Sequence, residues 1–143
     1  MPAAAVRRST AVSSGRPLAT TNALGHVTHF GYDALDLLVS RTDALGRTTT
    51  FGYDALGRRI AKVVDADGVA GGPTETHFFY EGWQVIEERD SGGATLATYV
   101  YGSEIDEVLT MQRGGQDYFY HADDLGSVMA VTDGAAAVAE RYE

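Results

Sequence analysis

Histidine and carboxylate groups come together at one place in the 143-residue chain, His121-Ala122-Asp123-Asp124. Imidazole and carboxylate groups are common metal ligands, so this stretch is a candidate metal site. Neighbouring residues of a strand point to opposite faces, however, and one histidine beside two acids makes an incomplete ligand set. We therefore expect these residues to form a turn leading into Leu125-Gly126, and we expect no metal site.

Candidate catalytic groups are equally incomplete. Ser127 follows a glycine, but the surrounding Asp-Leu-Gly-Ser-Val-Met-Ala lacks the Gly-x-Ser-x-Gly turn of a nucleophile elbow. The acid pairs Glu87-Glu88 and Asp123-Asp124 do not form a recognisable acid–base pair, which needs convergent groups. The glycine-rich stretches lack the Lys-Ser/Thr of a phosphate-binding loop. We expect no catalytic residue, no cofactor-binding residue and no cofactor.

Other polar residues have simple structural interpretations. His26 and His29 are three apart, a helical spacing inside a segment that otherwise reads as a strand. We expect them at the surface or in contacts between strands. Arg58, Arg59 and Lys62 follow a turn sequence, and we expect them to form a small basic cluster facing solvent.

The composition favours strands joined by many tight turns. The chain is about one domain long. It has 17 glycines, eight tyrosines and only three prolines, and aromatic residues are enriched in strands while glycine is typical of turns. There is no cysteine, which excludes a disulfide framework and thiolate metal sites but leaves the compartment open.

Charge and hydropathy limit the kinds of partner that the chain can bind. The net charge is −9; residues 1–63 hold eight Lys/Arg and four Asp/Glu, whereas residues 64–143 hold three and sixteen. An acidic chain is a poor candidate for nucleic-acid binding, which depends on phosphate neutralisation. We interpret the acidic half as a solvated face, with a basic cargo or neighbouring segment as the alternative. No apolar run approaches the ~20 residues of a membrane helix, and residues 1–17 lack the apolar core of a standard signal peptide.

A four-residue unit recurs along the first half of the chain. It is written Asn-Ala-Leu-Gly at residues 22–25, Asp-Ala-Leu-Asp at 33–36, and Asp-Ala-Leu-Gly at 43–46 and 54–57. Gly15 and Gly68 extend the series, so the closing positions step by 10 or 11 residues and two steps make a unit of about 21. The pattern predicts a repeat protein.

The unit has the chemistry of a chain reversal. Aspartate or asparagine is favoured at the first position of a type I turn, and glycine at the fourth. Such a turn closed by a left-handed residue is a common hairpin connection. Each unit therefore predicts a corner between two strands of six or seven residues. Asp36 replaces the closing glycine, at a modest conformational cost.

Aromatic residues two apart recur between the corners. The pairs are Phe30/Tyr32, Phe51/Tyr53, Phe78/Tyr80, Tyr99/Tyr101 and Tyr118/Tyr120. Residues two apart in a strand share a face, so the pairs predict an aromatic stripe across successive strands, stabilised by contacts between them.

The regular step ends near residue 69. Residues 69–75 read as a loop, followed by strands at 76–82, 83–90 and 94–102 with a turn at residues 90–93. Hairpins are expected about Gly114-Gly115 and Asp133-Gly134. No segment has a convincing helical period, although residues 135–139 have helix-forming composition.

These motifs resemble the RHS/YD-repeat proteins. Gly-Tyr-Asp-Ala-Leu-Gly-Arg-Arg at residues 52–59 resembles the YD repeat, and residues 42–59 resemble its 21-residue form. Residues 78–90 resemble the segment that follows the repeats, and residues 118–143 resemble the start of the RHS-associated core. The resemblance implies an all-β antiparallel sheet of repeat hairpins that spirals into a shell, of which this chain is a wall segment.

The resemblance also implies a domain organisation. Residues 1–14 match nothing in the family and are expected to be a disordered extension. The expected regions are then 15–68 with YD repeats, 69–117 with post-repeat hairpins, and 118–143 as a truncated core start. Bacterial relatives enclose toxic cargo and often release it by self-cleavage, but no residue here matches the cleavage acids. We expect no enzyme activity.

Three functions remain open from the sequence. The first is a structural shell segment whose partners are other shell segments and a C-terminal toxin cargo, exported through a specialised secretion system to the medium or cell surface after synthesis in the cytoplasm. The second is a carbohydrate-binding or cell-surface module that uses exposed aromatics such as Trp83 and Tyr101. The third is self-cleavage. An open sheet exposes unpaired edge strands, so self-association is also expected.

Overall fold

The fold is all-β and antiparallel. A computed structural model describes residues 8–11, 15–66 and 72–142, and within them it contains thirteen strands and no helix. The strands are β1 (Arg8–Ala11), β2 (Pro17–Thr21), β3 (Val27–Tyr32), β4 (Leu38–Thr42), β5 (Thr48–Tyr53), β6 (Arg59–Asp65), β7 (Thr74–Glu81), β8 (Gln84–Asp90), β9 (Thr95–Tyr101), β10 (Val108–Arg113), β11 (Gln116–Ala122), β12 (Val128–Asp133) and β13 (Val138–Arg141). This confirms the predicted fold class.

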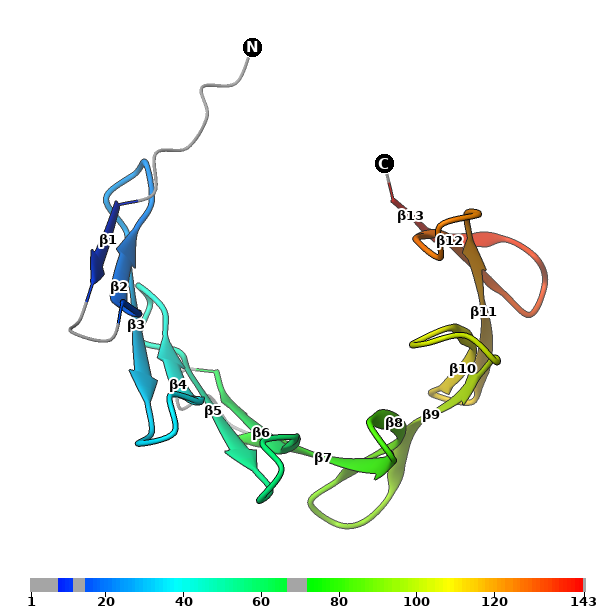
Figure 1. Ribbon diagram of the computed structural model, residues 1–143, viewed down its shortest axis with the longest axis horizontal. Coiled ribbons are helices and arrows are strands. Elements are labelled where there is room, and N and C mark those ends of the chain that lie inside the picture. The colour runs from blue at the N-terminus through cyan, green and yellow to red at the C-terminus, as the bar shows by residue number, and fades with distance from the viewer. Residues whose placement is uncertain (1–7, 12–14, 67–71, 143) are drawn as a thin grey trace. The chain divides into compact units, whose positions relative to one another are not determined.

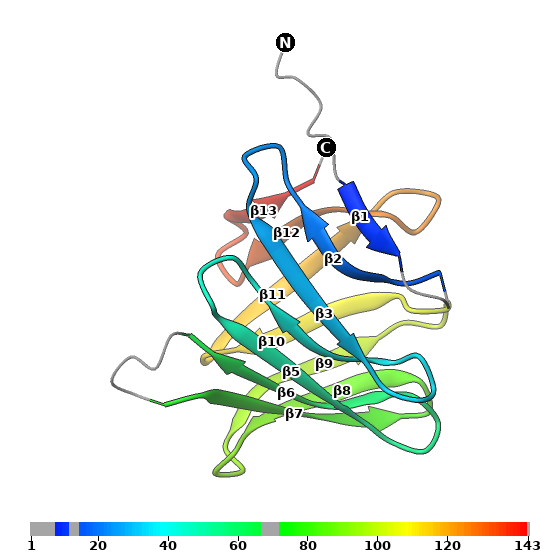
Figure 2. The same ribbon diagram turned by 90° about the vertical axis from the view of Figure 1, so that its left-hand side faces the viewer.

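The chain divides into two compact units, Met1–Glu75 and Thr76–Glu143. In the first unit, β1 to β6 pair in chain order, each antiparallel to the next (Figures 1 and 2). In the second unit, the strands from β7 to β13 pair in the same way. Successive turns therefore alternate between the two rims of each unit's sheet.

Seven turns share one corner geometry, and the four predicted repeat corners are among them. An aspartate or asparagine starts each corner, and its Oδ1 accepts the backbone N–H two residues later at 2.8–2.9 Å and the N–H four residues later at 2.8–3.0 Å. The starting residues are Asn22, Asp33, Asp43, Asp54, Asp90, Asp123 and Asp133. The side chain thus satisfies two donors that the turning backbone leaves without a strand partner.

The fourth residue of each corner has a left-handed backbone. Gly25 has φ of 81°, Gly46 of 83° and Gly57 of 78°, and a glycine adopts this conformation without steric cost. Asp36 has φ of 64°, as expected for a corner that lacks glycine. The predicted closing position at Gly68 lies outside the described residues.

The corner after β12 is closed by alanine. The sequence predicts a turn about Asp133-Gly134, but the left-handed residue is Ala136, with φ of 61°, and Gly134 occupies the second position. The corner begins at Asp133 as predicted, and its geometry needs positive φ at the fourth position rather than the second. Gly134 therefore lies at a position that does not require positive φ.

We predict that Ala136→Gly stabilises the second unit. An L-residue in the left-handed region costs about 1–2 kcal/mol, and the extra unfolded-state freedom of glycine returns roughly half of that, so a gain of about 0.5–1 kcal/mol is expected in the free energy of unfolding. Urea denaturation measures it. Ala135→Gly is the matched control, because Ala135 lacks positive φ, and it should destabilise. Equal changes in both variants would contradict the argument.

The aromatic pairs lie on alternate strands rather than on successive ones. They occupy β3, β5, β7, β9 and β11. Because corners recur about every 10 residues and the Phe/Tyr-Tyr pairs about every 20, each second strand carries no pair. In the first unit, Phe30 faces Arg41 on β4 and Phe51 faces Lys62 on β6. The aromatic face is therefore interleaved with other side chains.

A tyrosine hydroxyl bond repeats with the 21-residue period. The Tyr32 hydroxyl donates to the Pro17 carbonyl at 3.3 Å, and the Tyr53 hydroxyl donates to the Leu38 carbonyl at 2.8 Å. Both donors and both acceptors are 21 residues apart. Tyr101 makes the same kind of bond to the Val85 carbonyl at 2.9 Å in the second unit. Each tyrosine ring thereby lies across the start of the preceding strand and holds it in register.

Two boundaries differ from the sequence expectation. Residues 1–14 were expected to be disordered; residues 1–7 and 12–14 lie outside the described residues, but Arg8–Ala11 form strand β1, which pairs with β2 through Ser9 and Thr20. Strand β7 begins at Thr74, inside the segment 69–75 that was expected to be a loop. Pairing to a neighbouring strand can order a short segment whose own composition gives no strand signal.

The sheet leaves most side chains accessible. Among the described residues, the buried hydrophobic side chains are Ala97, 1% exposed, and Val131, 6% exposed. The third residue of most corners is a large apolar side chain in solvent, as at Leu24, Leu35 and Leu125. Backbone pairing and one-sided packing therefore hold the fold together, without a deep core.

Candidate functional site

A charged network crosses three strands of the second unit. Glu88 on β8 and Arg113 on β10 both lie directly opposite Ala97 on β9. Because the alanine methyl is short, the two long side chains meet above it, with Arg113 Nη2 2.9 Å from Glu88 Oε2. The ion pair covers Ala97, which explains why this residue is buried on an open sheet.

Tyr99 closes the network. It lies two residues beyond Ala97, on the same face. Its hydroxyl donates to Glu88 Oε1 at 2.7 Å and accepts from Arg113 Nη2 at 3.0 Å. Each of the three polar groups therefore bonds to the other two. Burial, together with the hydrogen bond and charge of Glu88, raises the pKa of Tyr99 to about 12.

We call Glu88, Tyr99 and Arg113 the clamp, because the protonation states of Tyr99 and Arg113 suit a structural role. Burial lowers the pKa of Arg113, but the hydrogen bonds and charge of Glu88 and Tyr99 outweigh it and the net shift is upward. The tyrosine keeps its proton and the arginine keeps its charge at any ordinary pH. A general acid or base needs a pKa near the working pH, so Tyr99 and Arg113 are suited to holding β8, β9 and β10 together.

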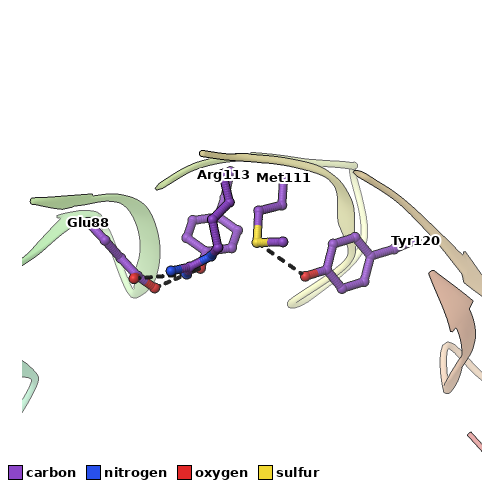
Figure 3. Close-up of polar contacts among 5 residues, drawn as sticks. Glu88, Met111, Arg113 and Tyr120 are labelled. Carbon is purple, nitrogen blue, oxygen red and sulfur yellow. Dashed lines mark hydrogen bonds and ion pairs between the residues drawn. The ribbon is translucent and has the colours of Figure 1, made fainter. Parts of the chain in front are cut away.

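The same face continues over β11. Met111 lies opposite both Tyr99 and Tyr118, and its sulfur accepts the Tyr120 hydroxyl at 3.8 Å (Figure 3). Val131, the other buried residue, lies opposite Tyr120. Tyrosine rings thus surround small or flexible residues on the intervening strands, and this arrangement supplies the little burial that the second unit has.

The candidate metal stretch forms a corner. Asp123 accepts the backbone N–H groups of Leu125 and Ser127 through one oxygen, each at 2.9 Å. His121 lies on β11, where its Nε2 is 2.9 Å from Thr132 Oγ1. Within the described residues, no group of three or more His, Asp or Glu side chains is arranged to hold a metal ion. The predicted turn into Leu125-Gly126 is confirmed.

Glu87 and Glu88 point to opposite faces, as their adjacency requires. Glu87 bonds Arg89 Nη2 and Thr95 Oγ1, each at 2.7 Å. The hydrogen bond from Arg89, then that from Thr95, lowers the pKa of Glu87. The two acids therefore belong to separate structural pairs, and they cannot act together on one substrate.

The basic cluster predicted near residue 58 is divided among different partners. Arg58 forms an ion pair with Asp54 in the corner, with 2.7 Å between Nε and Oδ2. The Arg59 guanidinium lies over the Phe51 ring, 5.7 Å from its centroid. Lys62 lies opposite Phe51 on β6. The expected clustering toward solvent is wrong for Arg58 and Lys62, which are half-buried.

The two aromatic residues singled out for sugar binding differ in availability. Trp83 is 71% exposed at the turn between β7 and β8. Tyr101 is half-buried, and its hydroxyl is bonded to the Val85 carbonyl. Stacking on a sugar needs an accessible ring face, so Trp83 suits this role better.

The clamp was not found from the sequence. Glu88 belongs to an acid pair and Tyr99 to an aromatic pair in the sequence, but no motif connects either residue with Arg113, and 25 residues separate the ion pair. Their only signal is register: the turn at residues 90–93 places Glu88 opposite Ala97, and Ala97 then faces Arg113 across the β9–β10 loop. That second loop, at residues 102–107, has no recognisable corner sequence.

These features define a class of protein, a structural repeat sheet in which Asx corners and bonded tyrosines recur. The described part of the chain has no helix that is both long and apolar enough to cross a membrane. Residues 13–45 and 32–70 match the RHS Repeat family. The chain carries RHS repeats over these residues, as the sequence resemblance indicates. The expected start of the RHS-associated core at 118–143 stays a prediction.

The chain is also similar to a curated relative and, in fold, to two solved structures. The tRNA3(Ser)-specific nuclease WapA of Bacillus spizizenii is 30% identical over 89 residues, which are 61% of this chain and 4% of WapA. Crystal structures of TcdB2-TccC3-Cdc42 and of TcdB2-TccC3 without its hypervariable C-terminal region align with TM-scores of 0.60 and 0.61, each at 18% identity. They cover 91% and 92% of this chain and 8% of theirs. The chain thus spans a small fraction of each protein.

Proposed function

We propose that this chain is a wall segment of an RHS-type shell that encloses a toxin-type cargo and has no catalytic turnover of its own. The observation that carries the proposal is the exact recurrence of the Tyr32 and Tyr53 bonds 21 residues apart. A unit that repeats its own stabilising contacts can be extended strand by strand, as in other repeat proteins. The folds of the TccC3-containing structures support the same architecture.

The partners follow from the sheet edges. Within the described residues, β1 pairs with β2 and β13 pairs with β12, so each presents one further backbone edge. Unpaired edges bind other strands. The partners proposed are other shell segments of the same repeat type, with self-association when these are absent. The proposed location is outside the cell or at its surface, reached from the cytoplasm through a specialised secretion system.

Copurification tests this proposal. The full chain, tagged at its N-terminus, is expressed in its source organism, and cell and medium fractions are purified under native conditions. The expected result is an assembly that contains a second polypeptide rich in Asp-x-Leu-Gly repeats and a cargo domain, with the cargo resistant to added protease until the assembly is unfolded. A chain that elutes as a monomer, or a cargo digested at the rate of the free domain, would overturn enclosure.

Carbohydrate binding is a second candidate, and the exposure of Trp83 favours it. Aromatic rings in solvent can stack on the apolar faces of sugars. The test is a glycan array probed with the full chain, with Trp83→Ala as the variant. Leu125→Ala is the matched control, because Leu125 is also a turn residue in solvent, 90% exposed. Binding lost in Trp83→Ala alone supports this function, and equal binding by both variants rejects it.

A further inference from the structure

The Asn22 corner of the first unit lacks an ion pair that the Asp43 and Asp54 corners have. In the corners that start at Asp43 and Asp54, the aspartate Oδ2 pairs with an arginine four residues later, at 2.6 Å and 2.7 Å. The corner at Asn22 has the same backbone bonds, with Oδ1 accepting from the N–H of Leu24 at 2.9 Å and of His26 at 3.0 Å. Its side chain ends in an amide nitrogen, which is a donor, and carries no charge.

This corner borders a polar cavity of about 260 Å³. Its lining includes Asn22 and His26 from the corner, the hydroxyl residues Thr20 and Thr28, and Arg41. A second pocket adjoins it and shares Asn22, His26, Thr28 and Arg41. Figure 2 shows the β2–β3 and β4–β5 turns that frame this region at one rim of the first unit's sheet.

Strand register places the donors on one face. Thr20 on β2 lies opposite Thr28 on β3, and Phe30 on β3 lies opposite Arg41 on β4. Since Thr28 and Phe30 are two residues apart, all four share a face. The arrangement gathers two hydroxyls and one guanidinium from three consecutive strands.

Arg41 has no partner within the described part of the chain. It forms no ion pair, hydrogen bond or ring contact there. By contrast, Arg16 pairs with Asp36 at 3.5 Å, and Arg47 pairs with Asp43. Asp43 is the only carboxylate that lines the second pocket, and its hydrogen bond with Arg47 holds the pKa of Asp43 below its usual value. Neither pocket therefore supplies a carboxylate that neutralises the charge of Arg41.

The geometry points to an oxyanion-binding site at Arg41, in which the guanidinium, the Thr20 and Thr28 hydroxyls and the Asn22–His26 corner bind a carboxylate or phosphate group. A guanidinium presents paired N–H donors that match two oxygens of such a group. Threonine hydroxyls and the asparagine amide supply further donors. An aspartate at position 22, as in the other corners, would place a negative charge against the ligand.

The experiment measures binding of inorganic phosphate and of ¹³C-acetate to the full chain by the line broadening of the ligand's ³¹P and ¹³C signals. This readout serves whether the chain is a monomer or an assembly. Saturable binding is expected with a dissociation constant of roughly 1–10 mM, in keeping with a few charge-assisted bonds. Arg41→Gln is expected to weaken binding about tenfold or more. The probe that binds more tightly identifies the preferred group.

Two matched variants make the test specific. Lys62 is the other cation on this face that has no described partner, and it lines neither pocket. The variant Lys62→Gln should therefore change the affinity by less than about twofold. Asn22→Asp keeps the corner, since aspartate starts six others, yet should weaken binding about fivefold through charge repulsion.

Three results would overturn the site. Equal loss in Arg41→Gln and Lys62→Gln would show general attraction to a basic face, and unchanged binding in Asn22→Asp would place the anion elsewhere. An absence of saturable broadening in the parent chain would reject binding outright. Far-ultraviolet circular dichroism checks that each variant keeps its β structure. We expect an unchanged spectrum for Arg41→Gln, because Arg41 is exposed and contributes no described contact.

Discussion

Replacing Ala97 with leucine is expected to lower the free energy of unfolding of the second unit by about 2 kcal/mol, within the usual range for overpacking. Ala97 is 1% exposed because the Glu88–Arg113 pair lies directly above it. A leucine side chain would occupy the space in which the carboxylate and guanidinium meet at 2.9 Å. Urea denaturation of the full chain, followed by circular dichroism, measures the change.

Loss of the clamp has a second readout. Burial and Glu88 together raise the pKa of Tyr99 to about 12. If leucine separates Glu88 and Arg113 and opens the site to water, the pKa of Tyr99 should fall toward its ordinary value of 10.0. Nuclear magnetic resonance of ¹³C-labelled tyrosine follows this titration directly. A stable variant in which the pKa of Tyr99 stays near 12 would contradict the proposed cover over Ala97.

Val100→Leu is the matched control for this substitution. Val100 is on the same strand but on the opposite face, and it is 57% exposed. Adding one methylene group there should change the free energy of unfolding by less than about 0.5 kcal/mol. A comparable loss in both variants would show that β9 tolerates no enlargement on either face and that the clamp is not the reason.

The corners were predictable because their chemistry is local. An Asx side chain that accepts two nearby N–H groups needs only four or five consecutive residues, so the sequence unit and the turn coincide at Asn22, Asp33, Asp43 and Asp54. The closure at Ala136 was missed because no local sequence signal marks it. Alanine carries no turn signal, and its positive φ is imposed by the strands that the corner joins.

The clamp and the Arg41 site were beyond sequence reasoning because they depend on register. Each strand's face follows from the period of two, but which residues become neighbours depends on the summed lengths of the intervening turns. A shift of one residue in the β9–β10 loop would move Arg113 to the other face. The bulge between Val108 and Thr110 introduces such a shift in register, and no pattern in the sequence predicts it.

Repeat comparison recovers part of this information. Corners with the same backbone geometry differ at their first and fifth residues, which read Asp43/Arg47, Asp54/Arg58 and Asn22/His26. The first two sets form ion pairs, and the third leaves its donors available. The sequence placed His26 at the surface, which is confirmed, but its role beside Arg41 required the pairing of β2, β3 and β4.

Substituting Asp90 with alanine is expected to destabilise the second unit by about 1–2 kcal/mol, because two hydrogen bonds to turn N–H groups are lost. Asp90 Oδ1 accepts from Gly92 at 2.9 Å and from Ala94 at 2.8 Å, and the corner fixes the register that sets Glu88 against Ala97. Urea denaturation measures the loss.

Asp90→Asn separates the hydrogen bonds from the charge. Asparagine should keep both bonds, as Asn22 does in its own corner, so a change of less than about 0.5 kcal/mol is expected, the range of a surface substitution that preserves its contacts. If asparagine destabilised as much as alanine, the negative charge of Asp90 would matter more than its acceptor oxygen. The Asx corner would then not explain why the chain repeats this residue at each reversal.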